Sequence, residues 1–155
     1  MINLLKALIV LCLLSGCGST PKEEIQEDVP MMGVVNPIKT YDTLEEVNSV
    51  VGTTLTLVDG AQDARFSTIT NTVAQVNFVY DGYELCLRSS FVEQGSELAG
   101  VYGDYQESVI DEYTVLTYDF GIVVLYDEGD EHRTLYIKQV VENEELKTLI
   151  SKVLK

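Results

Sequence analysis

Residues 76–88 read VNFVYDGYELCLR, and the pattern of this stretch decides the fold. Apolar and polar side chains alternate on both sides of Asp81-Gly82, a pair that favours a two-residue type I′ turn because both turn positions need a positive φ. Such a turn fixes the strand register. On the predicted core side, Tyr80 lies opposite Tyr83, Phe78 opposite Leu85 and Val76 opposite Leu87. On the more polar side, Val79 lies opposite Glu84 and Asn77 opposite Cys86. The sequence therefore predicts an antiparallel hairpin with one buried face.

Further segments with a period of two lie on both sides of this hairpin. We predict strands at residues 54–58, 64–70, 113–118, 122–126 and 133–138, with turns at residues 119–121 and 127–131. The connections are short, and strands do not alternate with helices. This pattern favours an antiparallel sheet, a meander of hairpins.

A helix is predicted at each end of the series of strands. In the first, Thr43 and Glu46 fit a capping box and Gly52 supplies a left-handed stop. In the second, Asn143 is expected as the N-cap, and one apolar face is formed by Leu146, Leu149, Ile150, Val153 and Leu154. Residues 35–155 are thus predicted to form a single α+β domain, with an antiparallel β-sheet, a short N-terminal helix and a C-terminal amphipathic helix packed on the sheet.

The N-terminal segment predicts where the protein resides. Residues 1–16 combine Lys6, an apolar run and small residues at the end, which is the layout of a cleaved export signal. The run is shorter than the about 20 residues that a membrane-spanning helix needs. Leu14-Ser15-Gly16-Cys17 resembles the lipobox of bacterial lipoproteins, which implies cleavage before Cys17, a lipid on its thiol and a place on the extracytoplasmic face of the cell membrane. The alternative is an ordinary signal peptide with an incidental cysteine.

Residues 17–34 mix Gly, Ser and Pro with several carboxylates, which predicts a flexible acidic tether between the lipidated Cys17 and the domain. The whole chain has 25 Asp and Glu against ten Lys and Arg, a formal charge of −15. Such a charge opposes phosphate groups, so it argues against nucleic acid binding and against docking on anionic lipids. The general effect of this negative charge is to keep the protein soluble, and binding to cationic partners remains possible.

Several short motifs of the domain occur together in one known family. They are Asn36-Pro37-Ile38, the short helix that ends at Gly52, the series of hairpins, GVYGDY at residues 100–105, a glycine turn at Gly121 and the closing helix. In these features the chain resembles an uncharacterised extracytoplasmic domain family of Gram-positive lipoproteins and membrane-bound regulators. The resemblance implies a binding or regulatory role outside the membrane, and it supplies no catalytic residues.

Residue types suited to catalysis or metal binding are sparse in this sequence. His132 is the single histidine, and its place at the end of an acidic turn predicts a solvated side chain. Asp119-Phe120-Gly121 matches a kinase tripeptide, but the other kinase motifs are missing, so a turn is expected. The carboxylates of residues 127–131 lack EF-hand spacing and allow only weak calcium binding. We expect no catalytic residue, no cofactor and no dedicated metal site.

Cysteine use agrees with export. If Cys12 leaves with the signal and Cys17 carries lipid, Cys86 is the one thiol left in the chain, and no internal disulfide can form. No His or Lys lies beside Cys86 in sequence to lower its pKa. We therefore predict a passive, half-buried thiol on the more polar face of its strand.

The aromatic composition suggests where a partner binds, because the chain has nine tyrosines and no tryptophan. In GVYGDY, two glycines free the backbone, and we predict that Tyr102, Asp104 and Tyr105 form an exposed loop that contributes to a partner or ligand surface. A tyrosine that closes the edge of a core is the alternative for any one of these rings. We favour a protein-binding or sensory and regulatory module. A lipoprotein that binds a small ligand or a cation comes second, and an enzyme comes last.

Overall fold

The computed structural model describes residues 36–154, so the predicted signal segment, Cys17 and the tether lie outside the described residues. The hairpin at residues 76–88 forms as predicted, and all five predicted residue pairs lie opposite each other. Asp81 and Gly82 have φ angles of 51° and 84°, as the two-residue turn requires. On the predicted core side, Val76 and Leu85 are fully buried.

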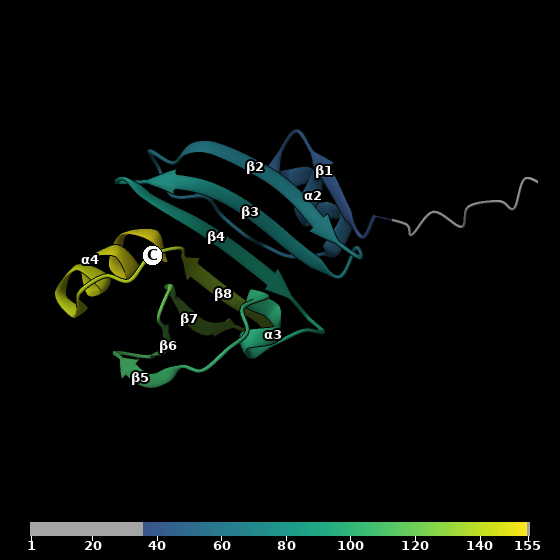
Figure 1. The fold of residues 1–155 in the computed structure, drawn as a ribbon. Coiled ribbons are helices and arrows are strands. Elements are labelled where there is room, and N and C mark those ends of the chain that lie inside the picture. The colour runs from purple at the N-terminus through teal and green to yellow at the C-terminus, as the bar shows by residue number, and fades with distance from the viewer. Residues whose placement is uncertain (1–35, 155) are drawn as a thin grey trace, which may run out of the picture. The chain divides into compact units, whose positions relative to one another are not determined.

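The described residues form eight strands in one antiparallel sheet (Figure 1). Along the chain the elements are β1 (Ile38–Tyr41), α2 (Leu44–Val51), β2 (Gln62–Ile69), β3 (Val73–Tyr80), β4 (Tyr83–Ser90), α3 (Gly95–Ala99), β5 (Gln106–Ile110), β6 (Tyr113–Tyr118), β7 (Gly121–Glu128), β8 (Glu131–Ile137) and α4 (Asn143–Val153). The order across the sheet is β1-β2-β3-β4-β8-β7-β6-β5. Each half is a meander, and the halves join where β4 pairs with β8. The predicted α+β antiparallel fold is confirmed.

The helices are divided between the two faces of the sheet. Val47 of α2 and the apolar side of α4 join the main core together with Val76 of β3 and Leu135 of β8. On the opposite face, Ala99 of α3 packs in a smaller cluster with Val123 of β7. Because helices cover both faces, the central strands are buried on both sides and lose the clean alternation of apolar and polar residues.

The predicted helix ends are confirmed for α2, and the predicted N-cap of α4 is wrong. Thr43 and Glu46 form the capping box, and Gly52 adopts the left-handed conformation at φ 86°. In α4 the N-cap is Glu142, one residue earlier than predicted, and it makes no side-chain capping bond. Asn143 already lies in the first turn, where its side chain is not placed to cap the helix.

Residues 54–58 do not form a strand, which corrects that prediction. Leu55 exchanges two hydrogen bonds with the side chain of Asn48, at 2.8 and 3.2 Å. The backbone N–H of Thr54 donates to the carboxylate of Glu131. Because side chains satisfy this backbone, the segment needs no neighbouring strand.

Three short elements were not predicted, namely β1, α3 and β5, which have four or five residues each. The turn predicted at residues 127–131 is also shorter in the structure, because β7 continues to Glu128 and β8 begins at Glu131. None of the helices within residues 36–154 is long and apolar enough to cross a membrane.

Candidate functional site

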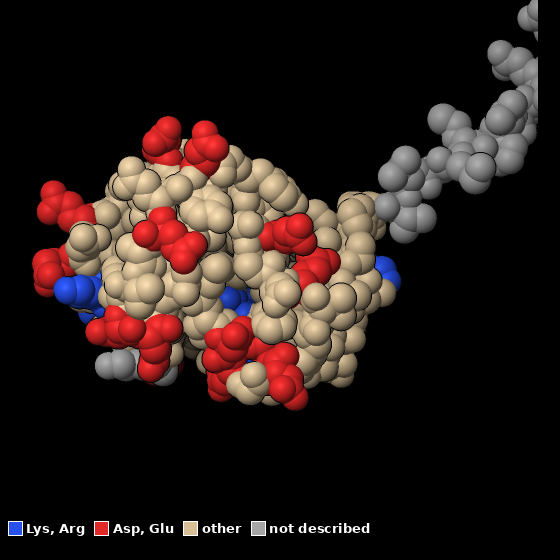
Figure 2. All heavy atoms as spheres, turned by 90° about the horizontal axis from the view of Figure 1, so that it is seen from below, with Lys and Arg blue, Asp and Glu red and all other residues tan. Residues whose placement is uncertain are grey.

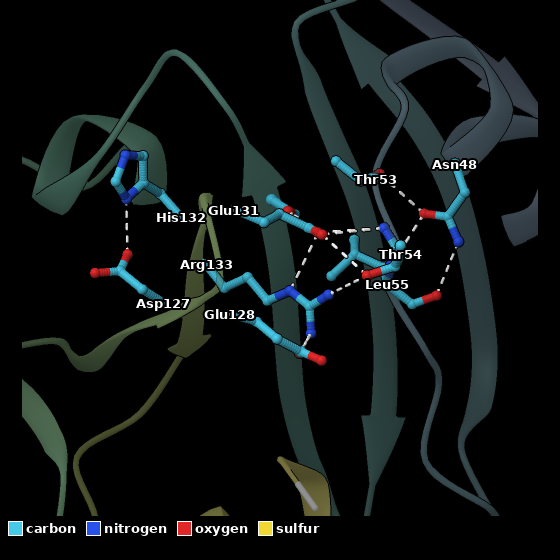
Figure 3. Close-up of polar contacts among 10 residues, drawn as sticks. Asn48, Thr53, Thr54, Leu55, Asp127, Glu128, Glu131, His132 and Arg133 are labelled. Carbon is cyan, nitrogen blue, oxygen red and sulfur yellow. Dashed lines mark hydrogen bonds and ion pairs between the residues drawn. The ribbon is translucent and has the colours of Figure 1, made fainter.

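A buried polar cluster lies where the segment after α2 meets the sheet, and Figure 3 shows its members converging. Glu131 is 3% exposed and Arg133 is 6% exposed. Glu131 accepts hydrogen bonds from the backbone N–H and the hydroxyl of Thr54. It also accepts from the Ser89 hydroxyl and, at 3.1 Å, from Nε of Arg133. The Arg133 guanidinium donates further bonds to Thr54 Oγ1 and to Glu128.

The cluster fixes the protonation of Glu131. Burial by itself would raise the pKa of this carboxyl, but the hydrogen bonds from Arg133, Ser89 and Thr54 outweigh burial and hold the pKa below its ordinary value. The carboxylate is therefore ionised at neutral pH, and its oxygens face donors of the fold. We interpret the cluster as structural, because it fastens the segment after α2 to strands β4 and β8.

His132 and Asp127 form a separate pair, with Nδ1 and Oδ1 2.7 Å apart. Successive strand residues point to opposite faces, so His132 and its neighbour Arg133 lie on different sides of β8, and Figure 3 shows the pair apart from the buried cluster. The pair borders a hollow of about 670 Å³. No serine or cysteine is among the residues that line this hollow, so the histidine has no such nucleophile to activate there.

The acidic run at residues 127–131 does not converge on one point. Asp127 pairs with His132, whereas Glu128 and Glu131 bond to Arg133. Within residues 36–154, no group of three or more His, Cys, Asp and Glu side chains is arranged to hold a metal ion. The run therefore supplies separate ion pairs in place of a shared set of oxygen ligands.

Cys86 is buried at 5% exposure, which corrects the prediction of a half-buried thiol. Burial raises the pKa of this thiol, although the nearby Arg88 and Lys138 act in the opposite direction. A thiol with a raised pKa stays protonated at neutral pH and is a poor nucleophile.

The segment 100–105 connects α3 to β5 and begins with a fixed backbone. Gly100 ends α3 in the left-handed conformation at φ 66°. Nη1 of Arg88 donates a 3.0 Å hydrogen bond to the carbonyl oxygen of Leu98, and a Cβ at Gly100 would collide with the same guanidinium. The next residue, Val101, is buried and anchors the start of the segment.

The rest of this segment lies at the surface, as predicted. Tyr102 is 74% exposed, Tyr105 is 49% exposed, and Asp104 is exposed between them. Gly103, at φ 132°, bends the backbone between the two tyrosines. The structure thus brings Asp104 and Tyr105 to the edge of a hollow, whereas Tyr102 is not among the residues that line it.

Three neighbouring aromatic rings, tilted relative to one another, lie at or next to the hollow beside this loop, and we call them the aromatic stack. The ring centroids of Tyr105 and Tyr118 are 5.5 Å apart, and so are those of Tyr118 and Phe120. Phe120 is 52% exposed at the turn between β6 and β7. We call the hollow, about 530 Å³, the tyrosine cleft; its lining residues are Asp104, Tyr105, Gln106, Thr117, Tyr118, Asp119 and Val140.

Tyr118 is the buried member of the stack, at 2% exposure. Its hydroxyl has no hydrogen-bond partner among the described residues. Burial, with a further contribution from Tyr105, raises the pKa of Tyr118. A buried hydroxyl without a partner is unfavourable by about 1–3 kcal/mol, and such groups need an explanation.

The charges of the tyrosine cleft are of one sign. Its lining includes the carboxylates of Asp104 and Asp119 and neither lysine nor arginine. Figure 2 shows a face of the molecule on which Asp and Glu side chains are spread widely and Lys and Arg side chains are few. By contrast, the hollow beside residues 63–65 of β2 is lined by charges of both signs, and there Lys138 pairs with Glu84 at 3.3 Å.

The sequence pattern found the loop but not the rest of the cleft. Tyr118 and Phe120 join Tyr105 only because β5 pairs with β6, and β5 was not predicted. The signal that could have found them is the row of aromatic residues at the end of β6 and in the turn that follows. Comparison of the chain with protein-family models, with curated proteins and with solved structures found no match.

Proposed function

We propose that this protein is a lipid-anchored, extracytoplasmic binding module, held at the membrane through Cys17, that contacts another protein through the loop at residues 100–105 and the tyrosine cleft. The lipobox residues Leu14 to Cys17 support the anchor. The exposed aromatic residues of the loop and cleft support the contact.

The observation that carries the proposal is a group of exposed rings at and next to the tyrosine cleft: Tyr105 lines the cleft, Phe120 neighbours its lining residue Tyr118, and Tyr102 is exposed in the same loop as Tyr105. Exposed single apolar residues are normal, but a group of exposed rings beside a cleft is typical of an interaction site. Tyrosine is enriched at the centres of protein interfaces because its ring gives a large contact area while its hydroxyl remains hydrogen-bonded. The side chain also loses little conformational entropy on binding.

The position of the cleft also supports this proposal. The described chain begins beside β1 at one edge of the sheet, and the loop leads into β5 at the other edge. With a strand spacing of about 4.8 Å, the two edges are about 34 Å apart along the sheet. The loop at residues 100–105 therefore leads into the edge strand farthest across the sheet from the start of the described chain.

The anchor is tested by Cys17→Ser. We expect the variant to lose the lipid and to leave the membrane fraction, because the thiol is the acceptor of the lipid in a lipobox and two acyl chains are needed for stable anchoring. Membrane fractionation and intact mass measure both effects. Equal partitioning of variant and parent, with no mass difference attributable to lipid, would show that the anchor is wrong.

The binding surface is tested by replacing Tyr102, Asp104 and Tyr105 together with alanine. We expect a melting temperature close to that of the parent, because these side chains are exposed, and a loss of the partner that in-cell crosslinking captures with the parent. The matched control replaces Phe91 and Val92 with alanine, since these are 47% and 74% exposed on another loop. A large drop in stability of the triple variant, or equal capture by it, would contradict the proposed surface.

A further inference from the structure

The tyrosine cleft offers a set of groups that is complementary to a cation. Two carboxylates, Asp104 and Asp119, line it, and no basic side chain lines it to neutralise them. The chain as a whole carries a formal charge of −15, so its field favours the approach of positively charged partners. Charge complementarity therefore selects the class of partner.

The aromatic rings add a second kind of affinity for a cation. Lysine and arginine bind to the faces of aromatic rings within about 6 Å of the ring centroid, and this attraction grows when the site excludes water. Tyr105 and Phe120 are each about half exposed, and the ring of each lies 5.5 Å from that of Tyr118. An aliphatic stem that ends in a charge can therefore lie against apolar rings and reach a carboxylate with its tip.

The buried hydroxyl of Tyr118 is the independent sign of a ligand. It is an oxygen with free acceptor capacity in a residue that lines the cleft, and no described residue satisfies it. An ammonium or guanidinium N–H can donate to it. This oxygen is closed to solvent in the described structure, so the proposed cation can reach it only if a group that covers it moves aside.

We infer that the tyrosine cleft binds a basic, exposed segment of a protein, with a lysine or arginine side chain held by Asp104, Asp119 and the aromatic stack. This inference rests on the proposed function and names the chemistry of its partner. The CH₂ groups of this lysine or arginine side chain pack on Tyr105 and Phe120. Its charged end bonds to the two carboxylates and to Oη of Tyr118.

The test uses the full chain in a non-ionic detergent and a fluorescent peptide in which lysine alternates with serine, with binding followed by anisotropy. We expect binding that weakens as salt is added, because exposed charges are screened. Asp104→Asn with Asp119→Asn should weaken binding at least about tenfold, since charge-assisted hydrogen bonds are lost. The matched control, Glu45→Gln with Asp59→Asn, removes the same charge outside the cleft and should change binding less than about twofold.

Tyr118→Phe gives a readout that a purely structural role of this residue would not change. The variant should bind the lysine peptide at least about threefold more weakly while its melting temperature stays the same or rises, because it loses an acceptor that the free protein leaves unpaired. If this variant and the asparagine pair both bind as the parent does, the inference is overturned.

Three further outcomes would also overturn it. They are equal weakening by the control pair, equal binding of a peptide in which glutamine replaces lysine, and equal binding of free lysine amide. The proposed function is judged separately by the crosslinking experiment. If capture still depends on Tyr102, Asp104 and Tyr105 while the lysine peptide does not bind, the interaction surface stands and only the chemistry of the partner is wrong.

Discussion

At the scale of single residues, Glu131 shows how a charge inside the fold is kept there. Its carboxylate is removed from water, yet donors from Thr54, Ser89 and Arg133 surround it. The sequence placed Glu131 in an acidic turn as one of several similar carboxylates. Its burial depends on the segment after α2 lying across the sheet, a contact between residues far apart in the chain that no local pattern records.

Glu131→Gln should lower the free energy of unfolding by about 3 kcal/mol at pH 7, because it leaves the buried Arg133 without its buried partner. Urea unfolding measures this difference. The control is Glu128→Gln, since Glu128 bonds to the same guanidinium from an exposed position and should contribute at most about 1 kcal/mol.

The difference in unfolding free energy between the parent and Glu131→Gln also depends on pH, in a direction that the pKa shift sets. The pKa of Glu131 is lowered in the folded protein, so its contribution is complete above the unfolded pKa of about 4.3 and is lost as the pH falls through the lower folded value. The difference between parent and Glu131→Gln should therefore shrink below about pH 4. A difference that stays constant from pH 7 to pH 3 would contradict the ionised, hydrogen-bonded carboxylate.

At the scale of elements, the strongly periodic segments were predicted and the weakly periodic ones were not. The hairpin of β3 and β4 has a turn that fixes its own register, and β6 has the predicted bounds Tyr113–Tyr118. β1 and β5 are short edge strands with largely exposed side chains, so burial leaves no alternation on them. The reverse error occurred at residues 54–58, where alternating threonine, leucine and valine imitate a strand although the backbone bonds to side chains.

The candidate site was also predicted only in part. Its exposed loop was predicted from glycines and tyrosines that are neighbours in the sequence, because they act locally on the backbone. Tyr118 and Asp119 were placed only in a strand and a turn, since their part in the cleft depends on the register between β5 and β6. The cleft also takes Val140 from the segment after β8, and such a contact between distant parts of the chain is not contained in any local pattern.

Gly82, in the turn between β3 and β4, and Gly121, the first residue of β7, are required for different reasons, and substitution separates them. At Gly82 the φ is 84° and the space is open, so alanine should lower stability by about 1 kcal/mol and asparagine should be nearly neutral. At Gly121 a Cβ would lie 2.7 Å from the carbonyl oxygen of Ile137 and 2.7 Å from the Tyr136 ring. Both alanine and asparagine should therefore destabilise there, by about 1–3 kcal/mol or more.

Thermal unfolding of the four variants, each compared with the parent, measures this contrast. If asparagine is tolerated at Gly121 as well as at Gly82, the close approach of Tyr136 is not what selects glycine at that position.

At the scale of the whole molecule, the sheet is one structure and not two, because β4 and β8 pair in the middle over six residue positions. The main core also includes residues from both halves, such as Val76 and Val124, under α2 and α4. We therefore expect a chain that begins at Val35 to fold alone and to unfold in a single cooperative transition.

Calorimetry tests this expectation. The calorimetric and van't Hoff enthalpies of the chain that begins at Val35 should agree, as two-state unfolding requires. Two separate transitions would show that the β1 to β4 and β5 to β8 meanders are independent units, and a broad transition without cooperativity would show that residues before Val35 complete the core.

The central pairing of β4 with β8 also decides when the protein can fold. Partners in this ladder are more than about 40 residues apart, so the sheet closes only after a long loop has been ordered. Until β8 has left the ribosome, the backbone N–H and C=O groups on this edge of β4 have no partner strand and can pair with other chains. In the export proposed here, this order would favour transport, because the eight-stranded sheet cannot be completed while β8 is still missing.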